Sequence, residues 1–313
     1  MATTFAFVFP GQGSQAVGML DAWGDHPEVR RTLDEASTAL GEDIGALIHT
    51  GPKEQLDLTT NTQPVMLTAG VACYRAWLAE TGLRPVAAAG HSLGEYTALV
   101  ASGALSLADA LPLVRLRAQA MQEAVPVGQG AMAAILGLDA QVVRATCLEV
   151  AAQTAQAVEA VNFNDPKQTV IAGSKAGVDA ACEALKAAGA KRALLLPVSA
   201  PFHSSLMKPA AERLRERLAD VAFATQDFPV INNVDVAVTS EVSALRDALY
   251  RQAFGPVRWV EVVQALKARG CTHIIECGPG KVLAGMVKRI DAELISATVL
   301  DPASLAEVRG LLA

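Results

Sequence analysis

The sequence lacks any long uncharged apolar run, although its overall composition is hydrophobic. Of its 313 residues, 51% are hydrophobic and only 4% are aromatic. A membrane-spanning helix needs about 18 consecutive residues that are mostly apolar. The richest stretch, residues 85–114, is interrupted by His91, Glu95 and Asp109. The apolar run Phe5–Phe9 is too short for a signal peptide, and no basic residue precedes it. The sequence therefore predicts a soluble protein without a targeting segment.

The sequence also lacks an excess of positive charge. It has 26 Lys and Arg against 32 Asp and Glu, which gives a net charge of −6. This balance argues against nucleic acid as the main partner, and an acidic partner would need a local basic patch. The high hydrophobic fraction excludes a disordered chain. The length fits about two domains, or one large domain.

Cysteine pairs with metal or redox spacing are absent as well. The five cysteines form no C-x-x-C motif, and their number is odd; they are Cys73, Cys147, Cys182, Cys271 and Cys277. This pattern favours free thiols in a reducing cytoplasm. No cluster of His, Cys and Asp has metal-ligand spacing, so we expect no metal.

Strand-like and helix-like segments alternate from end to end, which predicts an α/β protein. A strand at Phe5–Phe9 is followed by helices over 27–40 and 63–78, the second with Pro64 in its first turn. A buried strand over 86–90 leads directly into a helix, and Ser106 caps a further helix that extends to about residue 125. Helices near 205–219, 242–252 and 257–269, a strand over 272–276 and a helix from residue 281 follow.

A self-contained block lies within this alternation. Strands over 130–136, 157–162, 168–172 and 191–196 and helices over 139–151 and 174–188 give the order βαββαβ, which is typical of a ferredoxin-like unit. We therefore expect a large α/β domain of residues 1–126 and 199–313, with a small domain of residues 127–198 inserted into it.

The strongest chemical signal is Gly90-His91-Ser92-Leu93-Gly94. It has the G-x-S-x-G pattern of a nucleophile elbow and lies between a predicted strand and a predicted helix. Two glycines allow the sharp turn that would expose the Ser92 hydroxyl at a helix N-terminus. The alternative is a serine that only caps the helix.

A nucleophilic serine needs a base, and the sequence contains five histidines. His91 adjoins Ser92, so its side chain should diverge from the hydroxyl and support the site instead. His26 and His49 lie in polar segments typical of the surface. The order Ser…Asp…His of true hydrolases favours His273, but that residue lies in an apolar strand. His203 lies on a loop that enters a helix, and we favour it as the base.

Two glycine-rich loops allow other interpretations. Residues 11–16 match G-x-G-x-x-A, which suggests a dinucleotide site. The acidic residues about 20 positions further on fall in a helical pattern, which weakens that interpretation. A glycine loop can equally present backbone N–H groups to an oxyanion. Residues 278–281 do not form a phosphate-binding loop, because Ile275 stands where its first glycine should be.

Five segments together resemble the malonyl-CoA:acyl carrier protein transacylases. They occur in the family's order over nearly the whole chain: Phe9-Pro10-Gly11-Gln12-Gly13-Ser14-Gln15, Gly90-His91-Ser92-Leu93-Gly94-Glu95-Tyr96, Arg115-Leu116-Arg117, Ala200-Pro201-Phe202-His203-Ser204 and Glu276-Cys277-Gly278-Pro279-Gly280. The resemblance implies a hydrolase-like α/β core with an inserted ferredoxin-like domain.

The resemblance also implies roles at the matching positions. Ser92 would be the nucleophile and His203 its general base and acid, and backbone N–H groups of Gln12 and Leu93 would form the oxyanion hole. The main-chain carbonyl of Gln252 would orient the histidine in place of a carboxylate.

Substrate contacts follow from the same resemblance. Arg117 would bind the malonyl carboxylate, with Gln12 and His91 also at the substrate. Periodicity alone could not separate Arg117 from Arg115, because both flank the apolar stripe of their helix. The bulky Phe202 fits a malonyl pocket better than a methylmalonyl one.

The implied substrates are malonyl-CoA and an acidic acyl carrier protein, whose phosphopantetheine accepts the malonyl group in fatty acid biosynthesis. No other cofactor is implied, and no membrane partner. Lys281, Lys288 and Arg289, with Lys267 and Arg269 nearby, could provide a basic docking patch. The alternatives are a malonyl transferase of a polyketide pathway, an acyl hydrolase, a dinucleotide-dependent oxidoreductase and a non-catalytic binding module.

Overall fold

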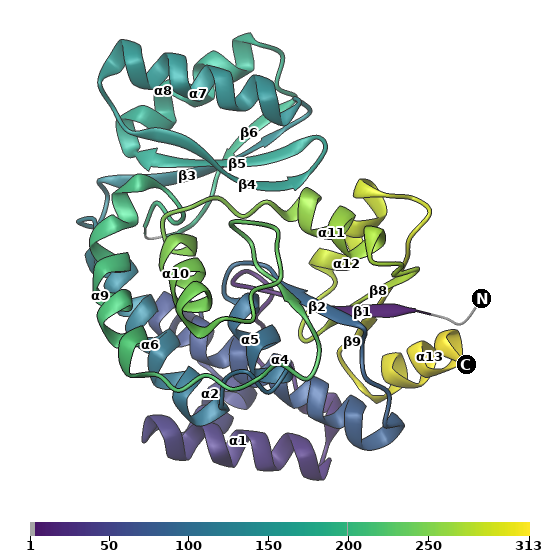
Figure 1. The fold of residues 1–313 in the computed structure, drawn as a ribbon. Coiled ribbons are helices and arrows are strands. Elements are labelled where there is room, and N and C mark those ends of the chain that lie inside the picture. Colours follow the sequence, from purple (N-terminus) through teal and green to yellow (C-terminus); the bar gives the residue numbers. More distant parts are fainter. Residues whose placement is uncertain (1–3, 199) are drawn as a thin grey trace.

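The computed structural model describes residues 4–198 and 200–313, which form two separate β-sheets (Figure 1). Sheet A has the order β7-β2-β1-β8-β9, and all of its paired strands are parallel. Its strands are β1 (Phe5–Phe9), β2 (Ala87–Gly90), β7 (Val230–Ile231), β8 (His273–Cys277) and β9 (Ile295–Val299). A mixed α/β fold with a parallel core is therefore confirmed.

Sheet B is antiparallel and lies apart from sheet A, with the order β4-β5-β3-β6. Its strands are β3 (Gly130–Leu136), β4 (Val158–Asp165), β5 (Gln168–Ser174) and β6 (Arg192–Leu195). Helices α7 (Ala140–Thr154) and α8 (Lys175–Ala187) cover its outer face (Figure 1). The order β3-α7-β4-β5-α8-β6 is the predicted βαββαβ order.

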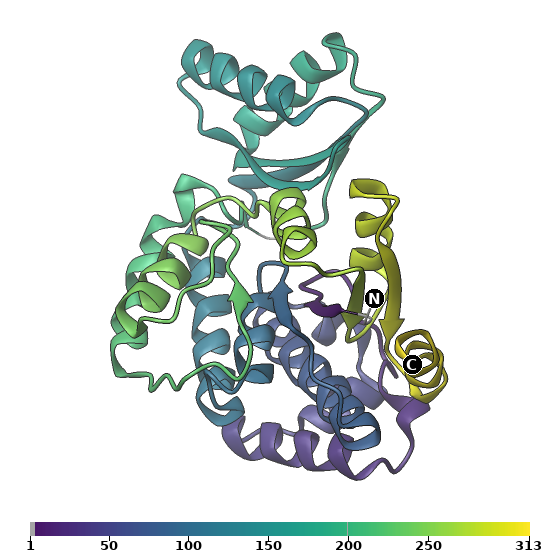
Figure 2. The ribbon, with the colours of Figure 1, turned by 45° about the vertical axis from the view of Figure 1, so that its right-hand side comes forward.

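The remaining helices surround sheet A (Figures 1 and 2). They are α1 (Pro27–Leu40), α2 (Ile44–Thr50), α3 (Lys53–Leu56), α4 (Thr59–Thr81), α5 (Gly94–Ala101), α6 (Leu107–Glu123), α9 (Lys208–Asp220), α10 (Val242–Gln252), α11 (Trp259–Ala268), α12 (Val282–Ile290) and α13 (Pro302–Leu312). Two short 3-10 helices, Asp21–Trp23 and Ser205–Met207, complete the set.

Alternate residues of β1 face two different cores. Phe5, Phe7 and Phe9 contact the aromatic side chains of Tyr74 and Trp77 on α4. Ala6 and Val8 face the opposite side, in the cluster that contains residues of α11 and α12. A buried parallel strand needs apolar residues on both faces, which explains the continuous apolar run. Much of the small aromatic content is thus concentrated between β1 and α4.

Several polar contacts join the strands of sheet B to the surroundings of sheet A. The N–H of Phe163 donates to the Val257 carbonyl over 2.9 Å, and the Val257 N–H donates to Val161 over 2.8 Å. The Glu159 carboxylate accepts hydrogen bonds from the N–H and the hydroxyl of Ser205. These contacts hold the face of sheet B that lacks helices against the larger unit. The division at 126/127 and 198/199 stays a prediction, and residue 199 lies outside the described residues.

The structure corrects one predicted helix and adds elements that the sequence did not predict. Helix α4 begins at Thr59, so Pro64 lies inside the helix and not in its first turn. The sequence predicts a later start because proline favours the first turn of a helix. Strands β7 and β9 and helices α2, α3 and α13 were not predicted. Strand β7 has only two residues, and most of β9 is partly exposed, so neither gives a clear apolar pattern.

None of the helices in the described part of the chain has the length and apolar character that a membrane crossing requires.

Candidate active site

Ser92 lies on a strained turn between β2 and α5. Its φ angle is +51°, in the left-handed region that side chains other than glycine rarely adopt. The two flanking glycines are required by close contacts. A Cβ on Gly90 would lie 1.8 Å from the carbonyl carbon of Gly94, and one on Gly94 would lie 2.0 Å from the Phe9 oxygen. The sequence motif therefore forms the turn expected of a nucleophile elbow.

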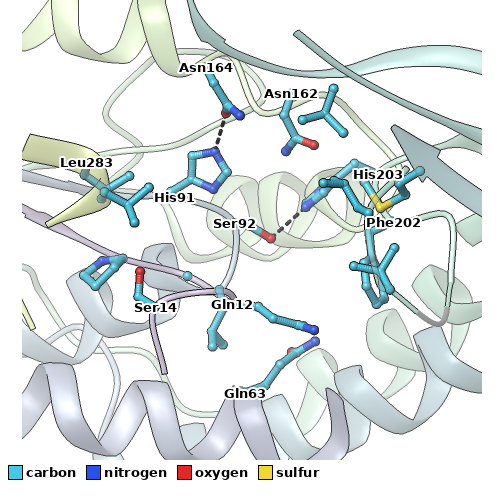
Figure 3. A pocket seen from close by; sticks show the side chains of 18 of the residues that line it. Gln12, Ser14, Gln63, His91, Ser92, Asn162, Asn164, Phe202, His203 and Leu283 are labelled. Carbon is cyan, nitrogen blue, oxygen red and sulfur yellow. Dashed lines mark hydrogen bonds between the residues drawn. The ribbon is translucent and has the colours of Figure 1, made fainter. Parts of the chain in front are cut away.

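The hydroxyl of Ser92 meets the ring of His203. Ser92 Oγ and His203 Nε2 are 2.7 Å apart (Figure 3). His203 Nδ1 lies 3.0 Å from the main-chain carbonyl oxygen of Gln252. Because a carbonyl can only accept, Nδ1 carries the hydrogen, and Nε2 is left to accept the serine proton. His203 itself has a φ of +65°, so both members of the pair are held in strained backbone.

The other four histidines have other partners. His273 is paired with Phe5, the first residue of β1, so it lies at the end of the parallel sheet opposite to Ser92. His91 Nε2 contacts Asn164 Oδ1 over 2.9 Å, and its ring packs against Trp259. The ring of His26 caps helix α1, while that of His49 contacts Asp21. Within the described part of the chain, His203 is the histidine in contact with Ser92 Oγ.

Burial determines the protonation state of His203. Burial lowers the pKa of the ring most, the nearby positive charge of Arg117 acts in the same direction, and the resulting pKa is about 3 instead of 6.5. The hydrogen bond to the Gln252 carbonyl acts in the opposite direction but does not outweigh burial. The ring is therefore neutral at physiological pH and able to act as a base.

The predicted oxyanion hole uses the backbone N–H groups of Gln12, in the loop after β1, and of Leu93, in the elbow. The loop after β1 packs directly on the elbow, because a Cβ on Gly11 would lie 2.6 Å from the His91 oxygen and 3.8 Å from the Leu93 nitrogen. The Ser92 N–H already donates to Asn233 Oδ1 over 2.8 Å. In the part of the chain that the structure describes, the N–H groups of Gln12 and Leu93 donate to no protein acceptor. They remain available to a developing negative charge.

Arg117 brings a positive charge to the nucleophile, although its residue is only 2% exposed. Its Nη2 lies 3.3 Å from Ser92 Oγ and 3.1 Å from Gln252 Oε1, and its Nη1 lies 2.8 Å from Gln63 Oε1. The guanidinium also stacks over the Tyr96 ring at 5.5 Å. Arg115, in contrast, pairs with Glu42 at the surface. The fold thus separates two arginines that periodicity could not separate.

These groups border one cavity of about 210 Å³ (Figure 3). Its floor is polar and carries Ser92, Arg117, Gln12 and Gln63, whereas much of its wall is apolar. The apolar lining residues are Met121, Met132, Val170, Leu196, Val198, Phe202, Val282, Leu283 and Met286. Strand β4 adds Asn162 and Asn164. The predicted residues Gln12, His91, Ser92, Leu93, Arg117, Phe202 and His203 all line this cavity, and Gln252 contacts three of them.

The sequence did not identify several residues that hold the site together. Asn233 binds both ends of the elbow, since its side chain accepts from the Ser92 N–H and donates to the Gly90 carbonyl over 2.7 Å. Gln63 holds Arg117. Glu95 accepts hydrogen bonds from Asn233 and Gln252. Of these residues, only Glu95 is conspicuous in the sequence, because it is a carboxylate inside an apolar stretch.

No group of three or more His, Cys, Asp or Glu among the described residues is placed to hold a metal ion.

The chain resembles known proteins along nearly its whole length. Residues 6–305 match the family described as "Acyl transferase domain". The malonyl CoA-acyl carrier protein transacylase of Escherichia coli K12 is 52% identical over 305 residues, which cover 97% of this chain and 98% of the relative.

Solved structures give the same result. The acyl-carrier-protein S-malonyltransferase of Burkholderia pseudomallei 1710b is 65% identical, with a TM-score of 0.96 over 98% of this chain and 100% of the other. A malonyl-transacylase in complex with a type II PKS acyl-carrier protein is 49% identical, with a TM-score of 0.96 over 99% of this chain and 100% of the other.

Proposed function

The chain belongs to the acyl transferase family, among its malonyl-CoA:acyl carrier protein transacylases, and we propose that Ser92 and His203 carry out the transfer of the malonyl group. It is an acyltransferase of fatty acid biosynthesis. The observation that carries the assignment of residues is the arrangement at the cavity floor. A serine–histidine pair lies there 3.3 Å from a buried arginine nitrogen.

The first half-reaction transfers malonyl to the enzyme. Ser92 Oγ attacks the thioester carbonyl carbon of malonyl-CoA while its proton moves to His203 Nε2. The carbonyl oxygen becomes an oxyanion and accepts hydrogen bonds from the N–H groups of Gln12 and Leu93. The C–S bond then breaks, and the CoA sulfur takes the proton from His203. The products are a malonyl-serine ester and the free thiol of CoA.

The second half-reaction runs through the same groups in reverse order. The phosphopantetheine thiol of the carrier protein gives its proton to His203 and attacks the ester carbon. The oxyanion forms in the same hole, the C–O bond breaks, and Ser92 takes the proton back. Each oxyanion donor contributes about 3 kcal/mol in comparable sites. No step requires a cofactor other than the two thiol carriers.

Arg117 selects the acyl group. A malonyl group places its carboxylate one methylene away from the carbonyl carbon, which matches the short distance between the guanidinium and Ser92 Oγ. The planar guanidinium can bind a carboxylate through two hydrogen bonds. A neutral acyl group would leave the buried charge without an ionic partner, which is costly. Phe202 borders the same cavity, and we expect its bulk to disfavour a branched acyl group.

The intermediate can be observed directly. We expect the intact mass of the protein, after mixing with malonyl-CoA, to increase by one malonyl group. Addition of phosphopantetheinylated acyl carrier protein should restore the original mass. Without acceptor, the ester should decay much more slowly, because the neutral Gln252 carbonyl makes His203 a weaker base than a carboxylate partner would. Malonate release as fast as transfer would instead identify a hydrolase.

Because His203 stays neutral, we expect the rate of acylation to depend little on pH under mildly acidic conditions. Because the pKa of His203 is lowered to about 3, the ring still accepts the serine proton below pH 6.5. We expect the single-turnover rate of acylation, at saturating malonyl-CoA, to change less than about twofold between about pH 5 and pH 7. A base with an unshifted pKa would lose more than about tenfold over that interval. Circular dichroism at each pH would verify that the protein remains folded.

We also propose that the carrier protein docks beside helix α12. Lys281 and Lys288 are exposed on or beside this helix, and Lys281 directly precedes Val282 and Leu283 of the cavity wall. Arg289 and Lys267 of the predicted patch are less suited to this role. Arg289 donates to Asp165 over 2.7 Å, and Lys267 pairs with Asp291 and Glu293. Their charges are therefore already compensated.

Reversing the two lysines tests the docking surface. We expect Lys281→Glu/Lys288→Glu to raise the KM for acyl carrier protein by roughly fivefold to 30-fold, by replacing attraction with repulsion. The rate of acylation by malonyl-CoA should not change. Lys175→Glu/Lys186→Glu on α8, which covers the outer face of sheet B, is the matched control. Equal effects of the two pairs on KM would argue against α12.

The state of the cysteines bears on the compartment in which the enzyme works. All five cysteines are free and buried. This arrangement fits a reducing environment, and we propose that the enzyme works in the cytoplasm.

A further inference from the structure

Arg117 is a buried charge whose direct contacts are all neutral. Its hydrogen-bond partners are the amide oxygens of Gln63 and Gln252 and the hydroxyl of Ser92. Among the described residues Arg117 forms no ion pair, whereas Arg115 on the same helix pairs with Glu42. An isolated charge inside a protein is costly unless an opposite charge is nearby. The protein must therefore compensate this cation before a substrate carboxylate arrives.

Glu95 lies one amide group away from Arg117. The side chain of Gln252 connects the two residues: its Oε1 accepts from Arg117 Nη2 over 3.1 Å, and its Nε2 donates to Glu95 Oε2 over 3.0 Å. The amide dipole thus points its oxygen at the cation and its N–H group at the carboxylate. Glu95 is only 1% exposed. An ionised Glu95 would explain both the orientation of Gln252 and the stability of the buried cation.

We propose that Glu95 is the resident counter-charge of Arg117: it is ionised before substrate binds, and it takes up one proton from solvent when the malonyl carboxylate pairs with Arg117. This inference rests on the proposed function, because it requires Arg117 to bind the malonyl carboxylate. Binding of one malonyl-CoA is therefore accompanied by the uptake of one proton, which is held by the carboxyl group of Glu95. The same proton is released when the malonyl group leaves on the carrier protein.

The hydrogen bonds of Glu95 allow this exchange without rearrangement. Both acceptor contacts, with the Asn233 N–H at 2.9 Å and with Gln252 Nε2, use Oε2. The other oxygen, Oε1, is buried and has no hydrogen-bond partner in the described part of the chain. Protonation at Oε1 therefore leaves both contacts in place. The elbow held by Asn233 and the histidine held by Gln252 keep their positions.

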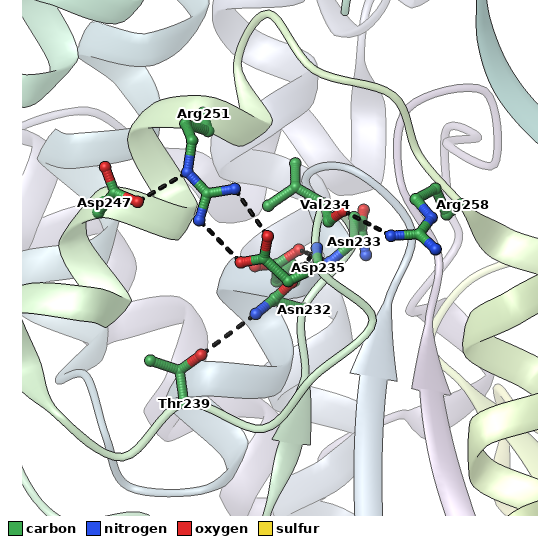
Figure 4. A network of polar contacts seen from close by, with 9 residues as sticks. Asn232, Asn233, Val234, Asp235, Thr239, Asp247, Arg251 and Arg258 are labelled. Carbon is green, nitrogen blue, oxygen red and sulfur yellow. Dashed lines mark hydrogen bonds and ion pairs between the residues drawn. The ribbon is translucent and has the colours of Figure 1, made fainter.

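The surroundings of Glu95 favour a carboxyl group that can change its protonation state near neutral pH. Burial raises the pKa of Glu95, and the hydrogen bonds from Gln252 and Asn233 lower it in part. Among the charged groups, Arg117 on α6 lowers the pKa and Asp235 in the loop after β7 raises it, and the resulting pKa is about 7. Asp235 is itself paired with Arg251 through two contacts of 2.7 Å (Figure 4). Tyr96 on α5 keeps its proton, because burial raises the pKa of its hydroxyl to about 12. Arg117 is thus the charge whose neutralisation by substrate matters most to Glu95.

Proton uptake on binding tests the proposal. Calorimetry of Ser92→Ala, which cannot be acylated, should be run near pH 7.5 in buffers of different ionisation enthalpy. We expect malonyl-CoA to take up a measurable fraction of a proton more than acetyl-CoA, which carries the same CoA phosphates. The difference should disappear in Ser92→Ala/Glu95→Gln, since glutamine cannot titrate. An undiminished difference in that double variant would overturn the proposal.

A second measurement does not depend on the Glu95 variant folding. In Ser92→Ala, the ratio of malonyl-CoA to acetyl-CoA affinity should fall as pH rises above about 7, by up to about tenfold per pH unit at the steepest point. The sign follows because the bound state holds the extra proton. A ratio in favour of malonyl-CoA that is independent of pH would overturn the role of Glu95 alone. Equal affinities at every pH would instead overturn the carboxylate contact of Arg117.

Discussion

Replacing Ser92 or His203 with alanine should lower kcat for malonyl transfer by about 10⁴-fold or more, and replacing both should cost no more than replacing one. The two side chains act as one unit, because Ser92 Oγ is 2.7 Å from the nitrogen that receives its proton. Without the serine no ester can form. Without the histidine the hydroxyl keeps its proton. Steady-state transfer to the carrier protein and the intact mass after exposure to malonyl-CoA measure both steps.

The rival histidine supplies the control for this prediction. His273→Ala should retain nearly full activity, because His273 is paired with Phe5 at the far end of sheet A. A malonyl adduct that persists in Ser92→Ala would refute the assignment of the nucleophile. Losses that multiply in the Ser92→Ala/His203→Ala double variant would show that the two residues act independently.

Local signals explain why much of the fold could be predicted from the sequence. The elbow was recognised because its glycines are needed within five consecutive residues, where a Cβ at either one would collide with backbone. The βαββαβ order can be predicted because its strands and helices follow one another directly along the chain. Helix α8 also has a clear N-cap in Ser174, whose hydroxyl accepts from the Gly177 N–H.

Contacts between distant segments explain what could not be predicted. Asn233 binds Ser92 across 141 positions, and Gln252 binds the same residue across 160. Neither lies in a spacing pattern, because the constraint acts only after the chain has folded. Gln63 and Arg117 similarly meet across 54 positions, from α4 and α6. The resemblance to a family identifies Arg117 and Gln252, whereas the contacts of Asn233, Gln63 and Glu95 become visible only in the folded chain.

The active site also explains why the chain can function with few charged residues. The interior contains very few charged groups, and two of them, Arg117 and Glu95, lie on either side of one glutamine amide. A net charge of −6 therefore says little about the substrate. The chemistry depends on one buried cation with a defined set of neutral partners, and recognition of the carrier protein depends on exposed lysines elsewhere.

The specificity of the enzyme should depend on that cation more than on any other side chain. We expect Arg117→Ala to lower kcat/KM for malonyl-CoA by roughly 10²- to 10³-fold, which corresponds to the loss of about 3–4 kcal/mol from a buried charge pair. Acetyl-CoA should react equally well or better, because the substitution removes the penalty for leaving the guanidinium unpaired. Competition between the two thioesters, read by the mass of the acyl-enzyme, measures the change in preference.

Arg117→Lys is the matched variant, because it keeps the charge and loses the planar pair of donors. It should retain part of the malonyl preference and lie between wild type and Arg117→Ala. An unchanged preference in Arg117→Ala would show that another group binds the carboxylate. The fold should survive the alanine substitution, because Glu95 can lose its charge. Without the nearby cation, the pKa of Glu95 rises above about 7. The carboxyl group then becomes protonated at neutral pH. The same titration that would accompany substrate binding thus protects the variant from an uncompensated buried charge.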